Sequence, residues 1–121
     1  MLKFSHVGMI TQSKKEGERW VEKTRVWVTD AARHPFSVEW LRYAPDSPVT
    51  GPVREEPHVG FEVEDIEEAA KGLKVLLEPF AVSDTLRVGF YQYDDGTVVE
   101  FAETISPEKQ KGGGRPSERF P

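Results

Sequence analysis

The chain has 121 residues, of which 37% are hydrophobic and 31% are charged, and this size and composition are typical of one compact globular domain. Its 16 basic and 21 acidic residues give a net charge of −5, which argues against a nucleic-acid partner. No apolar run reaches the roughly 20 residues of a membrane span, no signal-peptide pattern opens the chain, and cysteine is absent. We therefore expect a cytoplasmic protein without disulfides.

Two short segments of the chain begin alike. Residues 5–10 and 57–63 are both predicted strands, and each contains the tripeptide His-Val-Gly. The two tripeptides start at His6 and His58, so the pattern recurs after 52 residues. A recurrence of this length indicates two similar halves.

A predicted helix start follows each of these strands. Ser13 with Glu16, and Asp65 with Glu68, have the spacing of a capping box, in which a side-chain cap is followed three residues later by a glutamate. Each helix could cover one face of a sheet. The apolar residues that they would bury are Trp20 and Val21 in the first helix and Ile66, Ala69, Ala70 and Leu73 in the second.

Further strands are predicted in both halves. The β-rich segments are, in chain order, residues 25–29, 36–43, 74–78, 86–93 and 97–102. Asp94-Asp95-Gly96 supplies the turn chemistry of a tight hairpin between the last two. The second half is therefore predicted to have the order β-α-β-β-β, whereas residues 30–35 leave little room for another strand in the first half.

The spacing of charged residues supports a shortened first half. From His6 to Glu39 is 33 residues, and from His58 to Glu100 is 42, a difference of nine. About one strand and its turn need that many residues, so the first half is predicted to lack one strand. A half of about 50 residues does not readily form its own core, so the two are expected to pack together.

The domain boundaries follow from proline and glycine. Residues 45–56 are proline-rich and are predicted to link a first module at 2–44 to a second at 57–103, within one domain over 1–105. Residues 106–121 are predicted to be a flexible tail, with an interaction role as the alternative. Its basic residues are Lys109, Lys111, Arg115 and Arg119.

The repeated His-Val-Gly and the closing Val-Val-Glu-Phe resemble the vicinal oxygen chelate superfamily of glyoxalases, extradiol dioxygenases and bleomycin-resistance proteins. The resemblance covers about residues 2–103 and is most specific over 57–103. It implies an α+β fold in which two βαβββ-type modules, the first without one strand, form a cupped sheet. It also implies four metal-ligand positions: His6, Glu39, His58 and Glu100.

Strand alternation is an independent test of the two histidines. Residues two apart in a strand share a face, so His6 falls with Phe4 and Gly8, and His58 falls with Gly60. The residues that alternate with these along each strand are apolar and would face a helix. Both histidines are therefore predicted to point away from the helices, with the two glycines leaving space beside them.

The two glutamates give a similar result. Glu100 lies opposite Val99 and Phe101, and Glu39 falls on one face with Leu41 and Tyr43. A lone strand histidine or glutamate is more often structural than a ligand. Here, however, a strand histidine followed by a strand glutamate occurs in both halves of the chain. Two imidazoles and two carboxylates suit Zn²⁺, Ni²⁺, Fe²⁺, Mn²⁺ or Co²⁺ better than Ca²⁺ or Mg²⁺. A partial site and a metal-free relative stay open as alternatives.

Other polar residues are candidates for substrate contact. If Val88 and Phe90 pack against the helix, Arg87 and Tyr91 look into the cup, where they could bind substrate oxygens; the alternative is a structural cross-strand pair. His34 is expected to be structural or exposed, with a role as stand-in ligand or proton shuttle as the alternative.

The leading functional hypothesis is a divalent-metal-dependent, glyoxalase-like enzyme acting on a small oxygen-rich metabolite by lyase, isomerase or dioxygenase chemistry. Glu39 or Glu100 would serve as the general base. The alternatives are a metal-free binding protein of the bleomycin-resistance type and a sensor or interaction module. A homodimer is predicted, because a missing strand would leave an exposed sheet edge.

Overall fold

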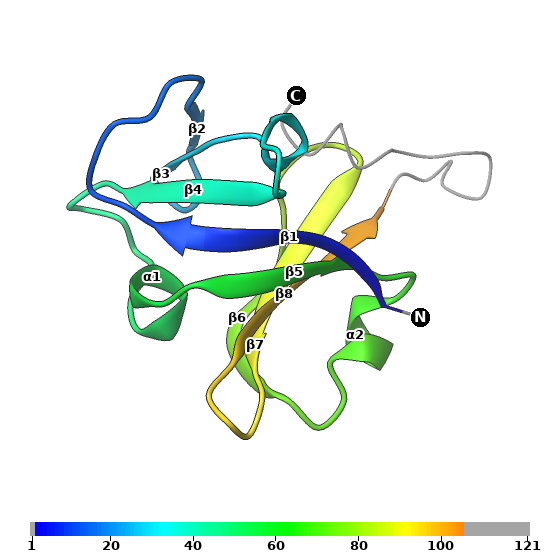
Figure 1. Cartoon of the computed structure of the whole chain (residues 1–121). Coiled ribbons are helices and arrows are strands. Elements are labelled where there is room, and N and C mark those ends of the chain that lie inside the picture. The colour runs from blue at the N-terminus through cyan, green and yellow to red at the C-terminus, as the bar shows by residue number, and fades with distance from the viewer. Residues whose placement is uncertain (1, 106–121) are drawn as a thin grey trace.

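A curled sheet of eight strands makes up most of the computed structural model, which describes residues 2–105 (Figure 1). The strands are β1 (Lys3–Ile10), β2 (Arg19–Val21), β3 (Val26–Val28), β4 (Val38–Tyr43), β5 (His58–Glu62), β6 (Lys74–Ala81), β7 (Leu86–Gln92) and β8 (Val98–Thr104). Their order across the sheet is β2-β3-β4-β1-β5-β8-β7-β6. Residues of the first and second halves of the chain thus occupy opposite halves of the sheet, which meet where β1 pairs antiparallel with β5.

The helices are short. They are the 3₁₀ turn η1 (Ala31–Arg33), α1 (Pro52–Glu55) and α2 (Ile66–Ala69). The predicted helix start at Asp65 is confirmed, because its carboxylate accepts a hydrogen bond from the backbone N–H of Glu68. Across the described residues, no helix has the length and apolar character that crossing a membrane requires.

Over the described residues, the first half of the chain lacks the predicted helix, whereas the sequence predicts that it lacks a strand. It contains four strands, so the predicted loss of a strand is wrong, and residues 11–18 form a loop where a helix was expected. Gly17 adopts a φ of 82°, which a helix does not accommodate, and Trp20 pairs with Trp27 as part of β2. The first half is shorter because this loop replaces a helix and because β2 and β3 have only three residues each.

The apolar core lies on both faces of the sheet. On the concave face, one cluster is built by Val49, Val53, Leu86, Val88, Phe90, Val98 and Ala102, and a second by Val26, Val28 and Leu41. On the convex face, Ile66 of α2 packs against Tyr91 and Phe101. Residues 45–56, predicted as a linker, contribute Val49 and Val53 to the core, and the predicted tail at 106–121 lies outside the described residues.

Candidate metal centre

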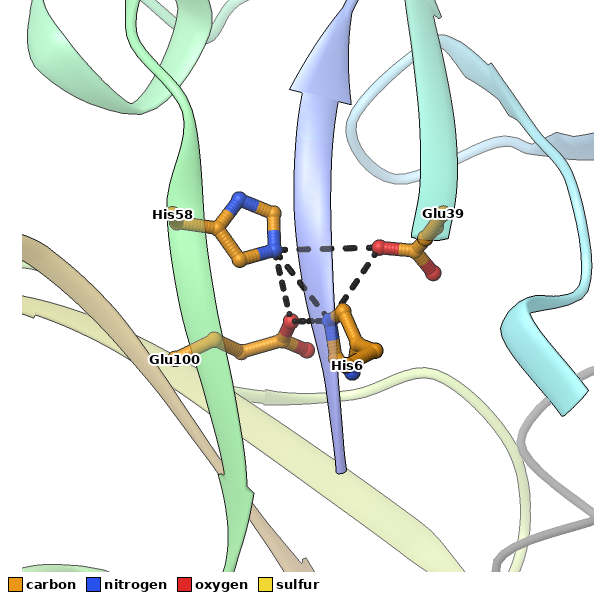
Figure 2. A group of neighbouring side chains, drawn as sticks. All are labelled: His6, Glu39, His58 and Glu100. Atoms are coloured by element: carbon orange, nitrogen blue, oxygen red, sulfur yellow. Dashed lines mark hydrogen bonds and ion pairs between the residues drawn. The ribbon is translucent and has the colours of Figure 1, made fainter. Parts of the chain in front are cut away.

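Four polar side chains meet where β1 pairs with β5, at the centre of the sheet (Figure 2). The antiparallel register sets each histidine opposite the glycine of the other strand, and the parallel neighbours β4 and β8 each add a glutamate beside that glycine. Each row across the sheet therefore holds a glycine between a histidine and a glutamate. The two rows are His6–Gly60–Glu100, here the first row, and His58–Gly8–Glu39, the second row.

The glycines reserve the space that the histidine rings fill. A Cβ atom added at Gly60 would overlap the ring of His6, and one added at Gly8 would overlap the ring of His58. The prediction that these two glycines lie beside the histidines is thereby confirmed. Any larger residue at either position would push a ring out of the cluster.

The four ligand atoms converge within a few ångströms. Nε2 of His6 lies 2.9 Å from Oε1 of Glu100, 3.3 Å from Nε2 of His58 and 3.4 Å from Oε1 of Glu39. Nε2 of His58 lies 3.1 Å from the Glu100 oxygen and 3.7 Å from the Glu39 oxygen. All four side chains are at most 2% exposed, so the cluster is held away from bulk water.

The electrostatics of the cluster couple its histidines to its glutamates. Burial lowers the pKa of His6, but Glu100 and Glu39 outweigh burial and raise it to about 9. Burial likewise opposes a charge on His58, whereas hydrogen bonds with the same two carboxylates raise its pKa. Protons on the histidines therefore balance the two buried carboxylates, and a divalent cation would supply the same compensating charge.

The donor set and its spacing fit a first-row divalent ion. Four ligand atoms at about 2.0–2.2 Å from a tetrahedral ion lie roughly 3.3–3.6 Å from one another. The distances measured between Nε2 and Oε1 atoms here run from 2.9 to 3.7 Å. The geometry of these four side chains is therefore that of a cluster that could hold a metal ion.

The two histidines are supported differently. Ser5 Oγ lies 2.9 Å from Nδ1 of His6, which can fix the orientation of that ring. Nδ1 of His58 is buried and has no hydrogen-bond partner among the described residues. His58 is instead held by packing, because the ring of Phe90 meets it edge-on at 5.2 Å between centroids.

A cavity of about 320 Å³ opens beside the cluster on the concave face. It separates the two concave core clusters, and Glu39 and Glu100 belong to its lining as well as to the metal-ligand set. Its apolar walls include Val26, Val28, Leu41, Phe80, Val88 and Phe90. A small molecule in this cavity would therefore lie against both glutamates.

The predicted substrate contacts lie on the other face of the sheet. Arg87 donates hydrogen bonds to Glu67 and Glu103, 2.6 and 2.9 Å away, and Tyr91 is stacked beside Phe101. The prediction that Arg87 and Tyr91 look into the cup is wrong, because the cup is lined by the apolar residues between them. Both faces of β7 bury side chains, so alternation alone gave no way to tell which face is concave.

Two smaller expectations concern Phe4 and His34. A register shift between Phe4 and His6 breaks the alternation, so Phe4 does not share the face of His6 but pairs with Phe61. His34 accepts a hydrogen bond from the backbone N–H of Phe36, which supports its structural interpretation. Alternation predicts Tyr43 on the face of Glu39, and Tyr43 does line the cavity, so the sequence carries a signal for this further site residue.

Comparisons with known proteins give two structural similarities. No protein-family model matches the chain, and no curated protein matches it. A glyoxalase family protein from Bacillus cereus aligns with 17% identity and a TM-score of 0.38, covering 88% of this chain and 96% of that one. A glyoxalase/bleomycin resistance protein/dioxygenase superfamily member from Vibrio splendidus 12B01 aligns with 15% identity and a TM-score of 0.41, covering 87% and 100%.

Proposed function

We propose that His6, Glu39, His58 and Glu100 hold a divalent first-row metal ion, and that the chain is a metal-dependent, glyoxalase-like enzyme. The observation that carries the proposal is the convergence of four buried ligand atoms from two glycine-centred rows. A buried set of two carboxylates and two imidazoles needs compensating charge, and a divalent ion supplies it. The predicted duplication of a βαβββ-type module belongs to this proposal, and the matching strand orders β1-β4-β3-β2 and β5-β8-β7-β6 support it.

The cavity suggests how the residues of the site would act on a substrate. When bound, the ion would supply a positive charge that stabilises an oxyanion developing on the substrate. Glu39 and Glu100 border both the cluster and the cavity, so either carboxylate could take a proton from the substrate and return it. The apolar walls would exclude water and hold the body of a small molecule, whose oxygens would face the cluster.

The test is the metal content of the purified full chain, measured by elemental mass spectrometry before and after reconstitution with Zn²⁺, Ni²⁺, Mn²⁺, Fe²⁺ and Co²⁺. We expect one ion per chain, lost in Glu100→Gln and retained in Glu62→Gln, a matched change elsewhere on the sheet. Binding should release protons, so metal affinity is expected to rise with pH until about 9, the pKa of His6. Absence of every ion after reconstitution would rule out the proposed enzyme.

A second candidate is a metal-free protein that binds a small molecule, as predicted from the bleomycin-resistance resemblance. The apolar lining of the cavity favours it, because such walls bind a ligand without any metal. Ligand binding that is unchanged by a chelator would support this candidate. The homodimer, the cytoplasmic location and the small-molecule partner stay predictions from the sequence.

A further inference from the structure

Tyr43 occupies the gap between the two concave core clusters. It ends β4, four residues after Glu39 and two after Leu41, so all three side chains share the concave face. Its ring packs against the cluster around Phe90 and also against the cluster around Val28. Tyr43 therefore lies along the cavity that separates these clusters, beside the two glutamates of the candidate metal centre.

The hydroxyl group of Tyr43 has no hydrogen-bond partner within residues 2–105. The guanidinium of Arg54 lies over the tyrosine ring, 5.8 Å from its centroid. Arg54 donates its own hydrogen bonds to the backbone carbonyls of Ala44, Ser47 and Val49. The phenol thus lies beside the cavity with no partner for its hydroxyl among the described residues, and a half-buried phenol ordinarily has one.

The phenol is held in its protonated form. Burial raises the pKa of Tyr43 well above its ordinary value, and the negative charges of Glu100 and Glu39 raise it further. At ordinary pH the group is therefore a neutral O–H donor. It can donate to a ligand oxygen, and it offers no negative charge that would repel one.

The charges around the cavity limit what can bind there. The interior walls are aliphatic and aromatic, and apart from Glu39 and Glu100 the charged residues of the lining all belong to the β2–β3 hairpin segment, namely Arg19, Glu22 and Lys23. An anion placed among the apolar walls would lose its hydration without a charged partner of opposite sign on those walls. A neutral molecule with an apolar body does not incur this loss of hydration.

We propose that Tyr43 is a specificity-determining residue that donates a hydrogen bond to an oxygen acceptor of an uncharged ligand with an apolar body. The proposal depends on the proposed function in taking the cavity beside Glu39 and Glu100 as the ligand site. It goes further by naming the class of ligand and the residue that selects it. A site with an available donor discriminates against a matching ligand that lacks the acceptor.

Acetophenone and ethylbenzene form a matched pair of probes for this donor. They have nearly the same apolar body, but only acetophenone has a carbonyl oxygen. The affinity of each for the full chain would be measured by NMR titration in wild type, Tyr43→Phe and Tyr91→Phe, with and without reconstituted metal. Tyr91 is the control, because its ring is buried on the convex face beside Phe101.

We expect Tyr43→Phe to weaken acetophenone binding about fivefold to tenfold and to leave ethylbenzene binding unchanged. Tyr91→Phe should leave the ratio of the two affinities as it is in wild type. A purely structural role for Tyr43 would instead weaken both probes equally, and that result would overturn the proposal. No binding of either probe to wild type would overturn it as well.

The outcomes separate this proposal from the proposed function. If the chain binds no metal but Tyr43→Phe selectively weakens acetophenone, the metal-dependent enzyme is excluded and the role of Tyr43 stands. If metal binds stoichiometrically and the ratio of affinities does not respond to Tyr43→Phe, the role of Tyr43 is excluded and the metal centre stands.

Discussion

The two halves of the sheet have convex faces that are covered by different kinds of interaction. In the second half, α2 buries Ile66 completely against an aromatic pair, so the cover is apolar. In the first half, the loop of residues 11–18 supplies Glu18, whose carboxylate accepts two hydrogen bonds from Arg42 at 2.7 and 2.8 Å. The Arg42 guanidinium in turn lies 4.0 Å from the centroid of Trp27.

The two halves have the same strand order although a helix covers only one of them, so the strand order does not depend on a helix. Burial of apolar area stabilises the second half, whereas an ion pair over indole rings contributes to the stability of the first half. In the first half, Lys15 also lies 4.4 Å from the centroid of the Trp40 ring. The candidate metal centre lies between the two halves, on the opposite face. Its geometry depends on the register of β1 with β5, and not on either cover.

The largest effect is expected when the apolar cover is removed. Ile66→Ala should lower the free energy of unfolding by about 3–4 kcal/mol, because Ile66 is fully buried and a cavity would remain. Denaturant unfolding measures this loss, and metal stoichiometry in native conditions should be unchanged. A loss below about 1 kcal/mol would mean that α2 contributes little to the second half.

The next effect tests whether the two rows are equivalent. Gly8→Ala and Gly60→Ala should each weaken metal binding by about 100-fold, because each new methyl group would displace one histidine ring. Competition with a metal-binding indicator measures both affinities. Met9→Ala is the control, since alternation along β1 directs Met9 to the convex face. Strongly unequal losses would contradict the equivalence of the rows.

A smaller effect tests the unequal support of the histidines. Ser5→Ala should weaken metal binding by about tenfold, because the ring of His6 would lose the partner of its Nδ1 atom. The same titration measures it, with Ser83→Ala on a distant turn as the control. An unchanged affinity would mean that packing alone orients His6, as it does His58.

The smallest effect concerns the polar cover and depends on pH. The hydrogen bonds from Arg42 lower the pKa of Glu18, so its stabilisation is present above the ordinary carboxyl pKa and is lost as pH falls through the folded value. Glu18→Gln should lower Tm by roughly 2–4 °C at pH 7. The difference between variant and wild type should shrink below pH 4, and a constant difference would contradict this origin.

The two histidines of the candidate metal centre were predictable from the sequence because their signals are local, whereas the set of four ligands was implied by the family resemblance. His6 and His58 occur in identical tripeptides, and alternation along a regular strand directs each away from its apolar neighbours. The register-dependent features were not predictable. Phe4 lies beyond a bulge at Ser5, and alternation carries no information across such a break.

The first half was mispredicted because its elements are short. A three-residue strand such as Arg19–Val21 has no periodicity of its own, and its pairing with β3, in which Trp20 contacts Trp27, is not visible in the local sequence. The face of Arg87 was mispredicted for another reason. Its strand is buried on both sides, and the curl that makes one side concave is a property of the whole sheet.

Each row of the candidate metal centre takes its ligands from both halves of the chain, so an ion there would link the two halves across the pairing of β1 with β5. The ligand set closes only after segments about 50 residues apart have paired, a slow, long-range step in folding. An ion bound afterwards would leave the refolding rate largely unchanged. It would slow unfolding by any route that separates β1 from β5. The same four side chains would then govern the lifetime of the folded chain.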